Sequence, residues 1–359
     1  MSDSKFKENS TLLLYKNCDE LKEEFLSLQT PRDVARLLEV SYDRLVYHLY
    51  IVPENRKYAE FSVPKKSGDT RIISAPATAL KILQRKLSQV LYSVYEPKAA
   101  VHGFVPSRSI LTNAKQHLHK RFILNIDLKD FFNSIHFGRV RGIFMAPPYK
   151  LPEEVATVLA KICCYSGKLP QGAPTSPIVS NMVCPRMDSQ LRLLAKEFKC
   201  TYTRYADDIT FSTTLPNFPK EIAYINIEED KPKILVGERL ISVIQDNGFE
   251  INENKVRLQY KTKHQEVTGL TVNQFPNVKR DYVRKISSML HAWDKFGLDS
   301  VQKRYIEKCS KELGIPAEEV PPFQEVLRGK INFLGMVRGK DNEIYRKYLN
   351  WYRRLSNRE

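Results

Sequence analysis

The sequence has 359 residues, of which 42% are hydrophobic and 27% charged, and its formal net charge at pH 7 is +16. The apolar content excludes a disordered chain, because it suffices for a core of ordinary size. The positive charge predicts contact with a polyanion, nucleic acid before an anionic membrane, although a basic protein without such a partner is the alternative.

Two further classes find no support. No stretch reaches 18 apolar residues and the first residues lack an apolar core, so neither a membrane span nor a secretory signal is expected. None of the six cysteines forms a C-x-x-C pair, which argues against a zinc site or a redox motif. The cysteines fit a reducing cytoplasm, with Cys163 and Cys164 as core residues.

The first part of the chain is expected to be helical and then to form a hairpin. Within residues 17–50, Thr30-Pro31 begins one short helix and Ser41 caps the next. Residues 58–74 alternate like two strands around a turn at 65–69. Residues 79–95 place their apolar side chains at helical spacing.

The central part alternates strands and helices. Its expected elements are a buried strand at 122–127, a helix at about 152–165, a Pro- and Gly-rich loop at 169–177, a helix to about 198, and a hairpin at 201–213 with its tip at 206–208.

The last part is expected to form a separate domain. Residues 214–233 contain prolines and an acidic cluster and predict a loop insertion. A helix at 234–247 would end at Gly248 in a left-handed cap. Strands follow near 256–260 and 265–272. From about 276 the pattern is helical and basic, with 18 Lys/Arg against 11 Asp/Glu over 279–359, a net of +7.

Two acidic sites carry the chemistry. Asp127 ends an apolar strand, and Asp207 and Asp208 follow Tyr205-Ala206 between strand-like runs. Carboxylates at the ends of apolar strands are costly unless they bind a cation. Paired carboxylates suit Mg²⁺, and two such ions can clamp the attacking and leaving oxygens of a phosphoryl transfer. The alternative is a surface turn, for which Asp-Asp is a common dipeptide.

Three segments resemble the motifs of reverse transcriptases. Asn125-Ile126-Asp127-Leu128-Lys129-Asp130-Phe131-Phe132 resembles motif A, Leu169 to Pro177 motif B, and Tyr205-Ala206-Asp207-Asp208 motif C, in the family's order. The resemblance covers roughly residues 58–275 and implies an α+β right-hand polymerase of fingers, palm and thumb, with an antiparallel palm sheet and a helical C-terminal thumb.

The resemblance also divides the chain. It implies an N-terminal helical region at 1–57, fingers with the start of the palm at 58–126, a palm at 127–275 with a fingers insertion at about 139–168, and a basic thumb or RNA-binding domain at 276–359.

The catalytic residues implied are Asp127, Asp207, Asp208 and Lys255. Two Mg²⁺ ions, with Mn²⁺ as the alternative, would be held by Asp127, Asp207 and the Leu128 carbonyl, with Asp208 as a weaker ligand. Lys255 resembles the motif D lysine that protonates pyrophosphate, and the alternative is a surface charge after a turn.

The nucleotide-binding residues implied are Lys65, Arg71, Phe132, Gln171 and Gly172. Lys65 and Arg71 would hold the triphosphate, unless they are solvated surface charges. The Phe132 ring would exclude a ribose 2′-hydroxyl and so favour DNA synthesis; a plain core aromatic is the alternative. Gln171-Gly172 would lie against the nascent base pair, where glycine allows close backbone approach.

Two shorter stretches resemble signatures of bacterial retron reverse transcriptases. Asn113-Ala114-Lys115-Gln116-His117 is similar to N-A-x-x-H, and Val267-Thr268-Gly269 to V-T-G. The residues implied for RNA recognition are Asn113, Ala114, His117, Val267, Thr268 and Gly269, although a lone His117 is more often structural.

A retron enzyme would copy a cognate structured noncoding RNA, priming from an RNA 2′-hydroxyl to give an RNA–DNA product. Its further partners would be deoxynucleoside triphosphates, an effector protein of the same operon, and host RNase H, with a role in antiphage defence. The basic aromatic stretches at 330–335 and 345–348 suit RNA backbone contacts, or equally an amphipathic core helix. Other readings are an intron-type or template-independent bacterial polymerase, or a silent RNA-binding scaffold.

Overall fold

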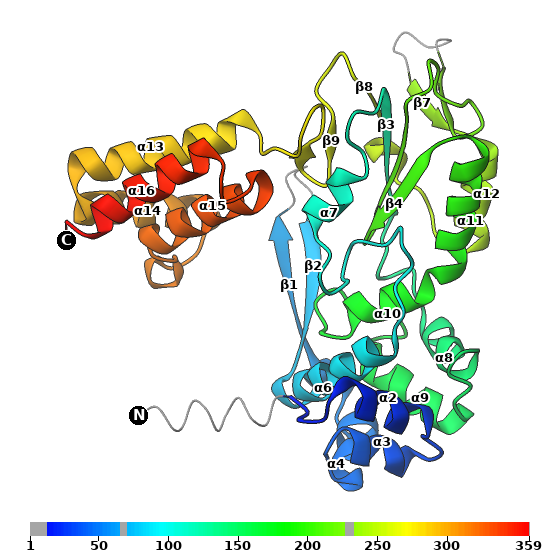
Figure 1. Ribbon diagram of the computed structural model, residues 1–359. Coiled ribbons are helices and arrows are strands. Elements are labelled where there is room, and N and C mark those ends of the chain that lie inside the picture. The colour runs from blue at the N-terminus through cyan, green and yellow to red at the C-terminus, as the bar shows by residue number, and fades with distance from the viewer. Residues whose placement is uncertain (1–12, 65–69, 227–232, 359) are drawn as a thin grey trace. The chain divides into compact units, whose positions relative to one another are not determined.

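The computed structural model describes residues 13–64, 70–226 and 233–358, which belong to two compact units (Figure 1). The larger unit comprises Met1–Ser109 and Phe122–Leu258, and the smaller unit comprises Ile110–Arg121 and Gln259–Glu359. The C-terminal segment of the smaller unit thus begins at Gln259, whereas the predicted C-terminal domain begins at 276. The smaller unit also includes Ile110–Arg121, from the first half of the chain. Among the described residues, no helix is both long and apolar enough to cross a membrane.

Short helices open the larger unit, as predicted. They are α2 (Cys18–Leu26), α3 (Pro31–Leu37), α4 (Tyr42–Val46), the π-helical turn η1 (Tyr47–Ile51) and α5 (Glu54–Lys57). Pro31 takes the first position of α3, and Thr30 forms a capping box with Asp33. Ser41 precedes α4 as predicted, but its side chain makes no capping hydrogen bond.

A two-stranded hairpin and a long helix follow. β1 (Tyr58–Pro64) and β2 (Thr70–Pro76) pair antiparallel with Phe61 opposite Ile73, and the predicted turn at 65–69 lies outside the described residues. α6 (Thr78–Val94) confirms the predicted helix. Its apolar positions at helical spacing are all buried, at Leu80, Leu83, Leu87, Val90, Leu91 and Val94.

A four-stranded sheet lies in the larger unit, in the order β4-β5-β3-β8. Its strands are β3 (Phe122–Asp127), β4 (Thr201–Tyr205), β5 (Asp208–Thr213) and β8 (Arg257–Tyr260), of which the first half of β8 belongs to this unit. β5 is antiparallel to both β3 and β4. Almost every residue of β3 and β5 is buried, which explains why both strands read as apolar runs.

Four helices of the larger unit lie between β3 and β4 in the chain. They are α8 (Phe137–Met145), α9 (Glu153–Cys163), α10 (Ser176–Val183) and α11 (Pro185–Glu197), and α11 lies along β4 (Figure 1). The single helix predicted up to about 198 is wrong, because α10 ends at Val183. Pro185 has no N–H to continue the ladder of α10, so the chain starts a new helix with proline at its first position.

The prediction of a loop at 214–233 is also partly wrong. This segment contains β6 (Ala223–Asn226), which pairs with β7 (Lys233–Val236) in a separate hairpin. The helix predicted at 234–247 therefore begins later, as α12 (Glu238–Asp246), after Gly237. Its predicted end is confirmed, since Gly248 has a φ of 71°. The acidic cluster at 228–230 lies outside the described residues.

The smaller unit joins α7 (Ile110–Lys115) to a hairpin. The strand predicted at 265–272 is instead β9 (Glu266–Val267) and β10 (Leu270–Thr271), which pair antiparallel around Thr268-Gly269. Both turn residues have positive φ, 47° and 82°, as a two-residue hairpin turn requires. α7 packs against both strands.

Four helices complete the smaller unit, as the helical pattern predicted. They are α13 (Arg280–Phe296), α14 (Leu298–Leu313), α15 (Phe323–Arg338) and α16 (Glu343–Ser356), with the 3₁₀ turn η3 (Ala317–Glu319) before α15. α15 and α16 approach closely at Gly335, where a Cβ atom would lie 2.4 Å from the Tyr345 ring. Asp294 on α13 accepts hydrogen bonds from Trp351, Arg354 and Arg358, at 3.0, 3.1 and 3.1 Å.

Candidate active site

The ends of two neighbouring strands bring together acids that lie 80 residues apart in the chain. β3 ends at Asp127 and β5 begins at Asp208, directly opposite it in the antiparallel register. Asp207 lies in the two-residue turn between β4 and β5, where Ala206 has a φ of 57°. The Leu128 N–H donates to the Asp207 carbonyl at 3.0 Å. The three carboxylates predicted to act together therefore lie at the same end of the two central strands, β3 and β5.

The surroundings of Asp207 and Asp208 raise the pKa of both carboxyl groups. Burial raises the pKa of Asp207, and repulsion by Asp127 adds to the rise. Burial raises the pKa of Asp208 to about 6, with repulsion by Asp207 and Asp127 contributing, although solvent reaches its side chain. Carboxylates that are buried and repel one another gain from a bound cation, because the cation offsets both the lost hydration and the repulsion.

An amine already compensates one of these acids. Lys255, in the 3₁₀ turn η2 (Glu253–Lys255), places its Nζ 2.9 Å from each carboxylate oxygen of Asp127. Asn252 Nδ2 donates to Oδ1 of the same carboxylate at 3.3 Å, and Asn252 N donates to the Asp127 carbonyl at 2.8 Å. The predicted proton donor thus lies within the acid cluster.

The donor set fits a hard divalent cation. Among the described residues, no group of three His, Cys, Asp or Glu side chains stands in a metal-coordinating arrangement. The Lys255 ammonium, however, occupies both oxygens of Asp127, as a bound cation would. Leu128 and Ile251 face each other in an antiparallel bridge. Its two hydrogen bonds run from Lys129 N to the Glu250 carbonyl and from Asn252 N to the Asp127 carbonyl, so neither uses the Leu128 carbonyl. The predicted ligands are therefore adjacent and oxygen-bearing, as Mg²⁺ requires.

Phe132 lies five residues after Asp127 and is half-buried. Its ring contacts Phe104 at a centroid distance of 6.2 Å and Phe131 at 5.4 Å. Asp130, which lies in the segment that resembles motif A, has a φ of 44°, so the chain turns sharply after β3. The Phe132 ring is therefore held in place by Phe104 and Phe131 and remains partly exposed.

The predicted loop at 169–177 lies against the β1–β2 hairpin. The Gln171 carbonyl accepts from Ser74 N at 2.9 Å. Gly172 has a φ of 128°, and a Cβ atom there would lie 2.9 Å from both the Ile73 side chain and the Ser74 carbonyl. Only glycine fits this approach. Arg71, exposed on β2, is near enough to lower the pKa of Asp207 against the effect of burial. Lys65 lies outside the described residues.

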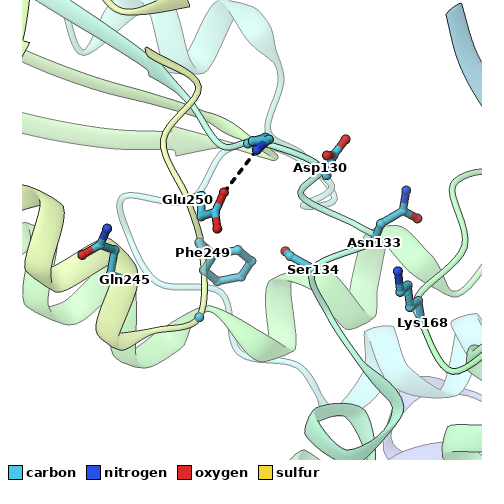
Figure 2. Close-up of a pocket in the computed structure, with 9 residues that line it drawn as sticks. Asp130, Asn133, Ser134, Lys168, Gln245, Phe249 and Glu250 are labelled. Carbon is cyan, nitrogen blue, oxygen red and sulfur yellow. Dashed lines mark hydrogen bonds and ion pairs between the residues drawn. The ribbon is translucent and has the colours of Figure 1, made fainter.

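A polar cavity of about 710 Å³ begins at the residues that follow Leu128, and Asp130, Asn133, Phe249 and Glu250 are among its lining residues (Figure 2). Residues that follow Asp127-Leu128 line one side, and the chain between α12 and η2 lines the other. Lys129 and Glu250 join the two sides through an ion pair of 3.4 Å and a backbone bond of 2.8 Å (Figure 2). Phe249 stacks on Phe131 with centroids 5.4 Å apart. These contacts therefore join the chain after β3 to the chain after α12 at the cavity wall.

The smaller unit brings its two signature segments together. Asn113 Nδ2 donates to Thr268 Oγ1 at 3.5 Å, and Thr268 Oγ1 donates to the Ile110 carbonyl at 3.3 Å. Asn113, Ala114, His117 and Val267 are buried, whereas Thr268 is half-buried and Gly269 exposed. RNA recognition by these residues stays a prediction, and burial limits direct contact to Thr268 and Gly269.

One group of residues was missed by sequence reasoning. Arg204, Asp188 and Asn181 form a buried hydrogen-bonded network directly beneath the Ala206-Asp207 turn. The available signal was a charged residue inside a predicted strand, since an arginine buried there without a partner would be too costly. Its partner on α11 could not be identified from the sequence.

Comparisons with known proteins show the family of the chain. Residues 63–273 match the family model described as reverse transcriptase (RNA-dependent DNA polymerase). The chain is 38% identical to the Retron Mx65 reverse transcriptase and 33% identical to the Retron Mx162 reverse transcriptase, both of Myxococcus xanthus, over 73% and 74% of its length. It is 32% identical to the Retron Ec86 reverse transcriptase of Escherichia coli, over 72% of this chain and 76% of that relative.

The aligned part spans 62% and 59% of the two Myxococcus relatives. A solved structure of telomerase from Candida albicans with a fragment of telomeric RNA aligns with 83% of this chain and 63% of its own, at a TM-score of 0.45 and 10% identity. That similarity is too low to carry an argument about this chain.

Proposed function

This chain belongs to the reverse transcriptase family and, within it, to the retron enzymes, and from that premise we propose that it copies an RNA template into DNA. The observation that carries the proposal is the meeting of Asp127, Asp207 and Asp208 at the adjoining ends of β3 and β5. A cluster of carboxylates, of which Asp207 and Asp208 have raised pKa values, is the environment that a two-metal phosphoryl transfer needs.

Two divalent ions are the proposed cofactors, Mg²⁺ or alternatively Mn²⁺. Asp127, Asp207 and the Leu128 carbonyl would hold them, with Asp208 as the weaker ligand. Bound there, such ions activate the primer hydroxyl and neutralise charge on the departing pyrophosphate. Lys255 would leave Asp127 when cations bind, which frees its ammonium to give a proton to the leaving group.

The remaining site residues would select and orient the nucleotide. Phe132 would exclude the 2′-hydroxyl of a ribonucleotide, since Phe104 and Phe131 restrict where its ring can move. Gln171 and Gly172 would support the nascent base pair through the loop that Ser74 holds. Arg71 and Lys65 would bind the triphosphate of the incoming deoxynucleotide.

The proposed template is a structured noncoding RNA encoded beside the gene. The hairpin that carries Thr268 and Gly269, shaped by Asn113 and His117, would read part of its fold, and an RNA 2′-hydroxyl would prime synthesis. The RNA–DNA product, an effector protein of the same operon and host RNase H would complete an antiphage system. No disulfide joins any of the six cysteines, which all lie in the described part of the chain, and this supports a cytoplasmic location.

The test is to incubate the full chain with that RNA, Mg²⁺ and deoxynucleotides. We expect DNA covalently joined to RNA, and no product from Asp207→Asn. Synthesis without the cognate RNA, or only from an annealed primer, would instead favour an intron-type or template-independent polymerase. Phage resistance that survives both Asp207→Asn and Asp208→Asn would favour an RNA-binding scaffold.

A further inference from the structure

A charged pair is fully buried beneath the catalytic turn. Arg204, on β4, and Asp188, on α11, are 0% and 2% exposed. The pair is bidentate, with Nε and Nη2 of Arg204 donating to the two Asp188 oxygens at 2.7 and 2.8 Å. A buried ion pair adds little stability over apolar residues of similar size, because both charges lose their hydration. Its presence therefore calls for a reason other than stability.

The remaining nitrogen of Arg204 reaches the catalytic turn. Nη1 donates to the Ala206 carbonyl at 3.1 Å and to Asn181 Oδ1 at 3.2 Å. Ala206 is the residue with positive φ that directly precedes Asp207. Asp188 thus holds the guanidinium in one orientation, and the guanidinium holds the carbonyl that sets the direction of the next peptide.

A second segment supports the same turn from outside the sheet. The main chain of Arg204 bonds to this segment twice, donating to the Ala100 carbonyl at 2.9 Å and accepting from His102 N at 2.8 Å. A Cβ atom on Gly103 would lie 2.4 Å from Ala206 N, so glycine backbone contacts the turn directly. Asn181 Nδ2 donates to the Gly103 carbonyl at 2.8 Å and so joins this segment to the network.

The network also extends to the predicted sugar-selecting ring. Phe104, which follows Gly103, has a φ of 57° and contacts Phe132. Asn181 lies on α10, the helix that follows the loop of Gln171 and Gly172 in the chain. Three parts of the site, namely the turn, the ring and the loop, therefore share one buried polar centre.

We propose that Arg204 is a positioning residue, which Asp188 and Asn181 orient so that it holds the Ala206-Asp207 turn in the geometry that binds metal. This inference rests on the proposed function. Lysine cannot replace Arg204, because one amine cannot bind a carboxylate in a fork and reach two further oxygens. The turn would then shift, and Asp207 with it.

The experiment compares four variants of the full chain. Arg204→Lys and Asn181→Ala remove contacts on one side of the turn, and Gly103→Ala displaces the turn from the other side. Tyr202→Phe is the matched control, since the Tyr202 hydroxyl donates to the same Asp188 oxygen at 2.7 Å and not to the turn. Mn²⁺ binding is read from the rise in melting temperature with Mn²⁺ concentration, and primer extension gives kcat and the KM for deoxynucleotides.

We expect Arg204→Lys to need about tenfold more Mn²⁺ for half of the thermal shift, the cost usual for groups that orient metal ligands. Its kcat should fall by about 100-fold with little change in KM, as for a displaced catalytic group. Gly103→Ala should behave similarly. Tyr202→Phe should lower the melting temperature without changing the Mn²⁺ midpoint or kcat.

The proposal would be overturned if Arg204→Lys kept the wild-type Mn²⁺ midpoint and kcat. It would also be overturned if Tyr202→Phe changed the Mn²⁺ midpoint and kcat as much as Arg204→Lys does. If Arg204→Lys does not fold, Gly103→Ala and Asn181→Ala decide, and a wild-type response in both overturns it. If the wild-type chain makes no DNA, the proposed function fails, whereas the Mn²⁺ titration still tests Arg204.

Discussion

Asp208 shows how a single carboxylate can be unfavourable for the fold and useful for the chemistry. Its pKa of about 6 lies above the value of about 3.9 in an unfolded chain, so the folded protein holds its proton more tightly. Stability from this group is therefore present at low pH and is lost as the pH rises through about 6. A bound cation would restore it.

We predict that Asp208→Asn raises the melting temperature of the metal-free protein at pH 7.5, because the repulsion by Asp207 and Asp127 disappears. The same variant should lose most DNA synthesis and show a smaller thermal shift with Mg²⁺. In the wild type, synthesis should fall as the pH is lowered through about 6, and added Mg²⁺ should recover part of it. Asp43→Asn, an exposed site, is the control; a lower melting temperature in Asp208→Asn would contradict the prediction.

The Phe132 ring is the second residue with a testable role. Phe132→Val removes the ring, so ribonucleotide incorporation should rise relative to deoxynucleotide incorporation. Phe132→Tyr keeps the ring and should retain the wild-type ratio. The ratio of kcat/KM for the two sugars in primer extension measures the effect. An unchanged ratio in Phe132→Val would leave Phe132 as a packing residue against Phe104 and Phe131.

Between elements, the contact of the 169–177 loop with β2 depends on one glycine. Gly172→Ala would place a Cβ atom 2.9 Å from the Ser74 carbonyl and so push the loop from the hairpin. We expect the KM for deoxynucleotides to rise more than kcat falls. Gly167→Ala is the matched control, since Gly167 also has positive φ but open space around its Cβ position. Equal effects in both variants would assign the change to backbone strain alone.

The α7 helix and the β9–β10 hairpin offer a similar test. Thr268 is β-branched and has a φ of 47°, a conformation that such residues rarely adopt. Its hydroxyl contacts Asn113 and Ile110, which explains the choice of threonine there. Thr268→Val should cost about 1 kcal/mol of stability and weaken binding of the cognate RNA, whereas Thr268→Ser should preserve both. Gel-shift and melting measurements would decide, and wild-type RNA affinity in Thr268→Val would count against a role for the turn.

At the scale of the whole molecule, the net charge of +16 should dominate binding to RNA. We expect affinity for the cognate RNA to fall by about 1,000-fold or more between about 50 and 200 mM salt, because bound cations are released from the phosphates. The KM for deoxynucleotides on a preformed complex, the internal control, should change far less. A flat salt dependence of RNA binding would show that the excess charge serves another purpose.

The sequence by itself determined the elements whose pattern is local. The helix α6 follows from apolar spacing, β3 from an apolar run that ends in an acid, and the end of α12 from Gly248. The acids Asp127, Asp207 and Asp208 were also found in this way, because a phosphoryl-transfer site needs these residue types at the ends of strands. The family resemblance supplied the roles of Phe132, Gln171 and Arg71.

Only the tertiary structure decided the rest. The β6–β7 hairpin was predicted as loop and helix, because its two short strands are stabilised by hydrogen bonds to each other and not by a pattern within either strand. Asn113 and Thr268 lie 155 residues apart in sequence and meet through a turn that no local pattern specifies. The partner of Arg204 could not be read from the sequence either. The buried charge of Arg204 is compensated by Asp188, which lies on another element. Which element packs against β4 at this point is decided by the tertiary structure and not by the local sequence.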